Sequence, residues 1–167
     1  INCWQEMVEI EPGVVSEKAG ELAFLSLSKA VEDLKSNFID AIVTAPINKA
    51  NVQNEQFQFP GHTEYFAKEF EQENYLMMMC SEDLKLAVAT GHIPLSEVKE
   101  TLTKDLLRQK LEVLFESLKT DFQIDRPKVA VLGLNPHAGE NGLLGNEESE
   151  VIGPVITELK KKGHLVY

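Results

Sequence analysis

The stretch KVAVLGLNPHAGE, residues 128–140, joins an apolar run to a polar loop. Residues 128–134 are apolar nearly throughout instead of alternating, and this pattern predicts a strand buried on both faces of a sheet. Two further stretches have the same form: DAIVT (40–44) leads into Ala45–Lys49, and KLAVAT (85–90) leads into Gly91 and His92. In open α/β sheets, ligands bind beyond the carboxyl ends of strands, so we expect a ligand-binding site at these three loops.

Helical and strand-like patterns alternate around these runs, which predicts an α/β fold. Tyr75–Cys80 and Lys85–Thr90 are close enough to form an antiparallel hairpin, so we expect a mixed, mainly parallel sheet with helices on both faces, a three-layer α/β/α arrangement. No linker or internal repeat interrupts residues 1–167, which predicts a single α/β domain. The predicted helices are Ser16–Asn37, His62–Gln72, Thr103–Phe122 and Glu147–Gly163, the last kinked at Gly153-Pro154.

Composition excludes several classes of protein. The net charge of −11 argues against a nucleic-acid partner, because phosphate backbones attract basic surfaces. No apolar run approaches the roughly 20 residues of a membrane helix, and no signal peptide is visible. The two cysteines, Cys3 and Cys80, lack metal or redox spacing, so a reduced, cytoplasmic protein is the simplest expectation.

Three of the four histidines lie in candidate site loops. His92 and His137 follow two apolar runs, and His62 opens a predicted helix in the segment GHTE. Imidazole is the commonest side-chain metal ligand, so His92 and His137 could share a divalent ion. A stable site needs a third protein ligand, which could be Glu140, Asn135 or a residue outside the chain. His164 follows Gly163 at a helix end and is interpreted as a surface residue.

Lys49 is a further candidate. It could be a solvated lysine, a cation that binds a substrate phosphate or carboxylate, or a proton-transfer group with a lowered pKa. Gly139, Gly142 and Gly145 make a flexible loop without the GxGxxG fingerprint of dinucleotide binding. Glu147 and Glu148 follow that loop, and the dipole of the next helix is enough to explain two acidic residues there.

At these loops the sequence resembles the 4-hydroxythreonine-4-phosphate dehydrogenase family (PdxA) of vitamin B6 biosynthesis. The matching stretches occur in the family's order and cover nearly the whole chain. They are DAIVTAPINKANV, FPGHTEYFA, LAVATGHIPLSEV and VAVLGLNPHAGENGLLGNEESEVIGPVI. The resemblance implies an isocitrate/isopropylmalate dehydrogenase-like fold, and a homodimer with the active site at the subunit interface. Chain ends at Ile1 and GHLVY suggest an internal piece of a larger two-domain enzyme that lacks its N- and C-terminal segments.

The resemblance also implies an activity. It is the NAD(P)-dependent, metal-dependent oxidation and decarboxylation of 4-phosphooxy-threonine to 3-amino-2-oxopropyl phosphate, in pyridoxal 5'-phosphate biosynthesis. Carried over onto this sequence, His62 and Thr63 bind substrate, while His92 and His137 bind the metal (Zn, Mg, Co or Mn). The third family ligand lies in a Tyr-His-Asp-Gln motif beyond Tyr167, so we expect this piece alone to be inactive. Lys49 is a candidate for a further contact with the anionic substrate.

Four alternatives stay open. Related enzymes oxidise other phosphorylated hydroxy acids, such as 4-phosphothreonate or 4-phosphoerythronate. A phosphate acyltransferase has a similar architecture and needs neither NAD nor a metal. A metal-dependent hydrolase could use His92 and His137 to activate water. The fourth reading is a non-catalytic fragment.

Overall fold

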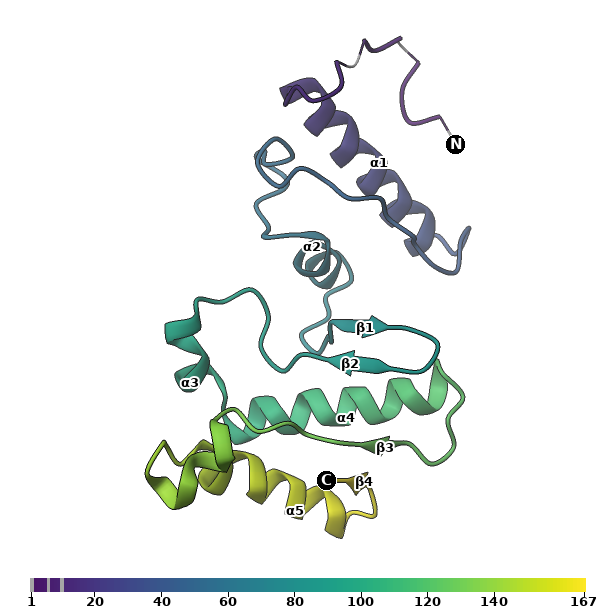
Figure 1. Cartoon of the computed structure of the whole chain (residues 1–167). Helices are drawn as coiled ribbons and strands as arrows, with labels where there is room; N and C mark the ends of the chain where they lie inside the picture. The colour runs from purple at the N-terminus through teal and green to yellow at the C-terminus, as the bar shows by residue number, and fades with distance from the viewer. Residues whose placement is uncertain (1, 6, 10) are drawn as a thin grey trace. The chain divides into compact units, whose positions relative to one another are not determined.

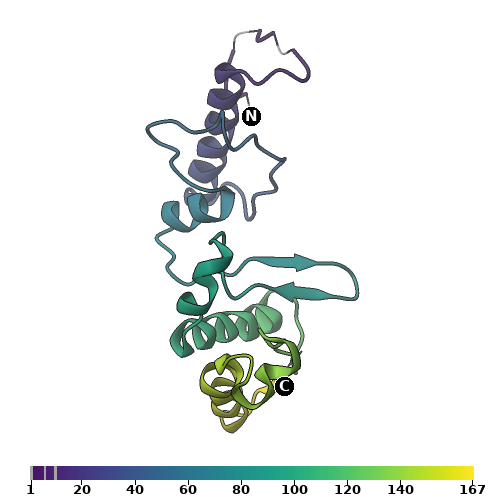
Figure 2. The ribbon, with the colours of Figure 1, turned by 60° about the vertical axis from the view of Figure 1, so that its left-hand side comes forward.

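The computed structural model describes residues 2–5, 7–9 and 11–167, and it divides into two compact units, Ile1–Glu73 and Asn74–Tyr167. Figure 1 shows the chain order of the elements, and Figure 2 shows the same ribbon from another side. Helices and short strands are both present. The prediction that residues 1–167 belong to one domain of a larger enzyme stays a prediction. Among the described residues, no helix has the length and apolarity to cross a membrane.

The first unit is built on helix α1, Glu17–Lys35. The Ser16 hydroxyl caps it by accepting the N–H of Ala19 at 3.2 Å, which satisfies one of the free donors of the first turn. Helix α2, His62–Glu69, follows a long irregular segment. Both helices confirm the predictions from periodicity. An aromatic core joins them, in which the rings of Phe57 and Tyr65 lie 5.1 Å apart. The buried core residues are Leu27, Val31, Val52, Phe57 and Tyr65.

The predicted buried strand Asp40–Thr44 is wrong in this structure. These residues form no strand, and the side chain of Val43 is 98% exposed. A strand requires a neighbour that accepts and donates its backbone hydrogen bonds. The described part of residues 1–73 contains no strand that could pair with this segment. An apolar run therefore has no strand partner that would bury it.

The second unit begins with a hairpin. Strands β1 (Met78–Cys80) and β2 (Lys85–Ala87) pair antiparallel, with Met79 opposite Leu86. This confirms the predicted hairpin, although both strands are shorter than expected. A 3-10 turn, η1 (Leu95–Glu97), and helix α3 (Val98–Thr101) lead to helix α4, Lys104–Thr120. The Thr103 hydroxyl caps α4 by accepting the N–H of Leu106 at 3.2 Å.

The rest of the second unit is a parallel strand pair with a helix. Strand β3 (Lys128–Val129) pairs with β4 (Leu165–Val166). Between them come the 3-10 segment η2 (Pro136–Gly142), a π-helical turn η3 (Glu148–Ile152) and helix α5, Gly153–Lys161. The predicted kink at Gly153-Pro154 takes the form of this π turn, because Pro154 cannot donate a backbone hydrogen bond. Gly163 then ends the helix region with φ +93°.

The predicted strand 128–134 is only partly formed. Val129 and Val131 face the core, whereas Leu132 is 76% exposed. The core of this unit lies between α4, α5 and the inner faces of the strands. Its most buried members are Leu159, Val155 and Val166. The described residues form one antiparallel and one parallel strand pair, and the predicted single mixed sheet is not present as a continuous sheet.

Candidate active site

Lys49 lies in a tight turn that is held by side chains. The amide oxygen of Asn48 accepts the N–H groups of Ala50 and Asn51 at 2.9 and 3.2 Å. The side chain of Asn51 donates to the Ser16 carbonyl at 2.8 Å, which fixes the turn against the start of α1. Gly20 makes this close approach possible, because a Cβ there would overlap the carbonyl oxygen of Asn51. The turn therefore gives Lys49 a defined position.

His62 and Lys49 lie close together in the first unit. The Lys49 Nζ is 3.9 Å from the point where a Cβ on Gly61 would lie, and Gly61 is the residue before His62. Burial lowers the pKa of His62, and the positive charge of Lys49 lowers it further. Its Nε2 is buried and makes no hydrogen bond within the described residues. The imidazole is therefore biased toward its neutral form, with a nitrogen that an added ligand could use.

A groove of about 260 Å³ opens beside His62. Its walls are one face of α1 and residues 42–47, and His62 contributes the imidazole. Thr63 follows on the same helix turn and is half-buried. Gly61 caps α2 without a side-chain hydrogen bond, so free backbone N–H groups remain at the helix start. Together with Lys49, this part of the first unit is suited to a small anion.

The two predicted metal ligands both lie in the second unit. His92 is exposed in the loop that follows β2, where the Gly91 carbonyl accepts the N–H of Ile93 at 2.9 Å. His137 is exposed in η2, beyond the carboxyl end of β3. Five consecutive residues of that loop, 137–141, have positive φ values between 48° and 77°. Four of them are not glycine, so the loop stores backbone strain that its surroundings must offset.

Two glutamates hold the start of the His137 loop. Oε1 of Glu148 accepts the backbone N–H of Asn135 at 2.6 Å, and the Asn135 side chain donates to Glu147 at 2.7 Å and to Glu148 at 3.2 Å. The hydrogen bond from the Asn135 backbone N–H lowers the pKa of Glu148. The pKa of Glu147 is lowered first by a hydrogen bond from the Glu147 backbone N–H and then by the Asn135 side-chain amide. The helix dipole alone is therefore not the explanation for this acidic pair. These contacts bind the loop to η3.

Gly139 is the second point at which the loop is fixed. It is buried with φ +77°, and a Cβ there would overlap the carbonyl oxygen of Gly145. The N–H of Leu144 also donates to the Gly139 carbonyl at 2.9 Å. Close backbone packing thus closes the loop on itself. These contacts fix Gly139, two positions after His137, against residues 144 and 145.

The described residues contain no complete set of side chains for a metal site. No group of three His, Cys, Asp or Glu side chains there could hold a metal ion. Asn135, considered as a third ligand, contacts Glu147 and Glu148 through its amide nitrogen, so its side chain is held against this acidic pair. His164, interpreted as a surface residue, is partly exposed, and its ring lies against Phe115 in a tilted arrangement with ring centroids 4.3 Å apart. The assignment of His92 and His137 as metal ligands stays a prediction.

Comparison with known proteins identifies the family. The sequence matches the pyridoxal phosphate biosynthetic protein PdxA family over residues 1–167. The chain belongs to the PdxA family. A 4-hydroxythreonine-4-phosphate dehydrogenase of Bacteroides thetaiotaomicron is 44% identical over 168 residues, which cover 100% of this chain and 46% of that protein. This PdxA chain thus spans about half the length of the curated relatives it matches.

Solved structures of PdxA relatives show the same fold. The 4-hydroxythreonine-4-phosphate dehydrogenase of Klebsiella pneumoniae superposes with a TM-score of 0.81 at 35% identity, covering 95% of this chain and 47% of that one. The enzyme of Burkholderia phymatum gives a TM-score of 0.72 at 36% identity, covering 93% of this chain and 47% of that one. The PdxA chain therefore has an α/β fold, as its sequence predicts.

Proposed function

We propose that this PdxA chain is part of an NAD(P)-dependent, divalent-metal-dependent dehydrogenase. Its reaction is the oxidation and decarboxylation of 4-phosphooxy-threonine to 3-amino-2-oxopropyl phosphate, in pyridoxal 5'-phosphate biosynthesis. The observation that carries the proposal is the family match over residues 1–167, together with curated relatives named 4-hydroxythreonine-4-phosphate dehydrogenase. Two local observations support it: Lys49 lies beside His62 in the first unit, and hydrogen bonds hold the start of the His137 loop in the second unit.

The first unit supplies contacts to the anionic substrate. His62 and Thr63 begin α2, where free backbone N–H groups favour negative charge. Lys49 adds a cation beside His62. A neutral His62 has one nitrogen that donates and one that accepts, so it can bind a hydroxyl and a phosphate oxygen of one substrate. In this proposal these residues orient the substrate, and Lys49 strengthens binding of its phosphate or carboxylate.

The second unit supplies metal ligands. His92 and His137 are exposed imidazoles on loops that follow strands, and neutral imidazole is the commonest metal ligand among side chains. The third ligand comes from outside residues 1–167 in this proposal. A bound divalent ion supplies Lewis acidity at the substrate hydroxyl and at the carbonyl that replaces it. The Glu147 and Glu148 contacts hold His137 in place for that role.

We infer that the chain forms one α/β domain of a larger two-domain enzyme, with a three-layer, isocitrate/isopropylmalate dehydrogenase-like sheet arrangement. The enzyme acts as a cytoplasmic homodimer with its site at the interface. The exposed apolar residues Val43 and Leu132 support it, because a further layer would bury side chains that now face solvent.

An activity assay of the complete enzyme tests the function. We expect reduction of NAD with 4-phosphooxy-threonine, loss of the activity on chelation, and recovery when a divalent ion is added. His92→Ala and His137→Ala should remove metal binding, whereas His164→Gln serves as a control outside the site. Faster turnover of 4-phosphothreonate or 4-phosphoerythronate would overturn the substrate assignment. Full activity after rigorous metal removal would overturn the metal dependence.

A further inference from the structure

Strand β2 has one paired and one open edge. The N–H of Val88 donates to the Met77 carbonyl at 3.2 Å, and Leu86 lies opposite Met79. Successive residues of an antiparallel pair direct their backbone groups to opposite edges. The N–H and C=O groups of Ala87 and Ala89 therefore point away from β1. Among the residues that the structure describes, no strand pairs with this edge.

The segment that continues β3 has a matching open edge. The N–H of Val131 donates to the Tyr167 carbonyl at 2.7 Å, and the N–H of Tyr167 donates to the Val129 carbonyl at 2.9 Å. By the same alternation, Ala130 and Leu132 direct their backbone groups to the opposite side. No described strand lies along that side either. Unpaired edges of this kind are templates for an additional strand.

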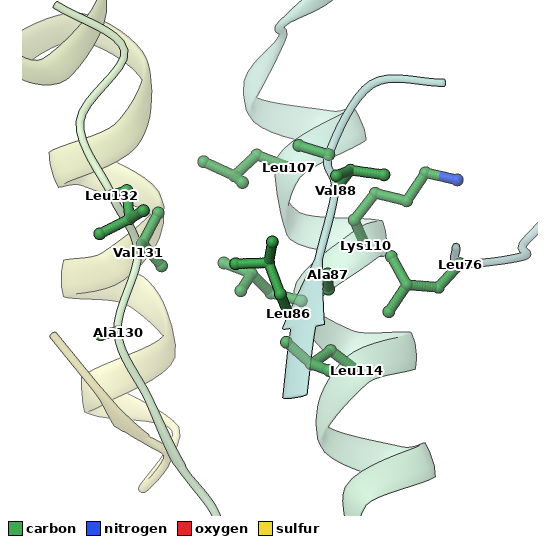
Figure 3. Close-up of a pocket in the computed structure, with 12 residues that line it drawn as sticks. Leu76, Leu86, Ala87, Val88, Leu107, Lys110, Leu114, Ala130, Val131 and Leu132 are labelled. Carbon is green, nitrogen blue, oxygen red and sulfur yellow. The ribbon is translucent and has the colours of Figure 1, made fainter. Parts of the chain in front are cut away.

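Both open edges face one apolar cavity, which we call the strand slot. It has a volume of about 210 Å³, is bounded by Leu86–Ala89 and Ala130–Leu132, and has Leu107, Leu111 and Leu114 of α4 along it. Figure 3 shows the two bounding segments running in the same direction, with the slot between them. A second cavity of about 140 Å³ continues along both segments as far as Thr90 and Leu134.

Apolar side chains make up nearly all of the slot lining, which suits an apolar occupant. Lys110 is its one charged lining residue among those described, and its Nζ donates to the Tyr75 carbonyl at 2.5 Å and lies 4.5 Å from the centre of the Tyr75 ring. The ammonium group of Lys110 is thus bound to Tyr75 and not to the backbone of either strand edge. The backbone of an extended segment needs hydrogen-bond donors and acceptors on both sides. The slot offers both, and the leucines of α4 provide an apolar surface beneath it.

We propose that the strand slot binds one extended apolar segment from the portion of the PdxA enzyme outside residues 1–167. The segment runs parallel to β2 and β3 and hydrogen-bonds to Ala87 and Ala89 on one side and to Ala130 and Leu132 on the other. It joins the two strand pairs into one continuous sheet over α4. The length of the relatives supports this source, because they are about twice as long as this chain and have the additional polypeptide.

Amide hydrogen exchange tests the proposal. One sample is the 167-residue chain, and the other is a chimera in which it replaces the matching segment of the Bacteroides thetaiotaomicron relative. In the chimera we expect exchange of the Ala87, Ala89, Ala130 and Leu132 amides to slow by more than about tenfold. The amides of Val88 and Val131, which already have partners, serve as internal controls.

Two outcomes would overturn the assignment. The first is fast exchange of the four amides in a chimera whose Val131 amide is protected. The second is protection in the chain alone that rises with its concentration, because the occupant would then be a second copy. These readouts need neither metal nor turnover, so they are independent of the proposed activity.

A second experiment tests the proposal if the chimera does not fold. The isotope-labelled chain is titrated with the separately produced portions of the Bacteroides relative that lie outside the match. We expect saturable shifts of the slot-edge amides with one portion. Ala87→Pro removes a slot-facing N–H and should weaken that binding at least about tenfold, whereas Ala87→Ser keeps the N–H and should bind as the parent does. No shift with any portion, or equal binding by both variants, would overturn the proposal.

Discussion

Glu148 accepts the backbone N–H of Asn135 at 2.6 Å, across thirteen residues of chain. The same carboxylate accepts the Asn135 side-chain amide at 3.2 Å, and Glu147 accepts it at 2.7 Å. Glu147 also lies 3.6 Å from the Lys99 ammonium. The loop that carries His137 therefore begins at a residue tied to η3 by charge-assisted hydrogen bonds, which are stronger than neutral ones.

Replacing Glu148 should loosen this loop. Glu148→Ala removes both hydrogen bonds to Asn135 and should lower the free energy of unfolding by about 1–3 kcal/mol. In the complete enzyme it should also weaken divalent-metal binding, because His137 would no longer be held. Glu150→Gln changes an exposed carboxylate on the same turn and serves as the control. Chemical denaturation and cobalt titration measure the two effects, and unchanged metal affinity in Glu148→Ala would contradict the positioning role.

The acidic pair also predicts a dependence on pH. Both carboxyl groups have folded-state pKa values below their ordinary range. Their contribution to stability is therefore present above the unfolded pKa and is lost as the pH falls through the lower folded value. We expect denaturation curves between about pH 5 and pH 2 to show a smaller loss of stability in Glu148→Gln than in the parent chain. Identical slopes in both proteins would argue against the contact.

The pKa of His62 should report the position of Lys49. Burial is the larger cause of the lowered pKa and Lys49 the second, so Lys49→Met should raise the pKa of His62 but leave it below its ordinary value. Titration of the imidazole C–H resonances by NMR measures this change. Lys18→Met, which removes a charge from an exposed ion pair with Glu21, is the matched control. A His62 pKa that moves equally in both variants would refute a specific contact.

Because folding lowers the pKa of His62, protonation of this residue opposes folding. The contribution of neutral His62 to stability is complete above the unfolded pKa of about 6.5. It declines as the pH falls toward the lower pKa of the folded state. His62→Gln should therefore flatten the stability profile between about pH 7 and pH 5. Thermal denaturation across this range checks the prediction, and a profile as steep as that of the parent chain would contradict it.

Gly20 should be irreplaceable at the contact between α1 and the Lys49 turn. A Cβ there overlaps the carbonyl oxygen of Asn51, which is backbone and cannot rotate away. Gly20→Ala should destabilise the chain by about 1–3 kcal/mol, the usual cost of overpacking. Gly91→Ala is the control, because no atom lies within 4 Å of its added Cβ. Equal melting temperatures for the two variants would disprove the close approach.

A substitution at Gly139 tests the close backbone packing of the His137 loop. Gly139→Ala places a Cβ on a residue with φ +77° and into the Gly145 carbonyl. We expect a loss of at least about 1 kcal/mol, with the largest amide shifts in residues 135–145. Gly13→Ala also has a positive φ but open space around it, so it separates backbone strain from the clash. A smaller effect at Gly139 than at Gly13 would contradict the packing.

The sequence by itself determined the elements whose signals are local. The helices predicted over Ser16–Asn37 and Thr103–Phe122 and the hairpin of β1 and β2 all depend on residues close together in the chain. Helix periodicity and tight turns act over a few positions. The motifs around His62, His92 and His137 were likewise enough to indicate the PdxA family.

Only the tertiary structure decided the contacts between distant residues. The apolar run at Asp40–Thr44 predicted a buried strand, yet burial needs a neighbouring strand that the pattern of one segment cannot supply. Periodicity also gave no sign that Glu148 would bind Asn135 or that Lys49 would lie beside His62. These pairings depend on how separate elements pack. Local propensity fixes an element, whereas long-range backbone and side-chain partners fix its place and its burial.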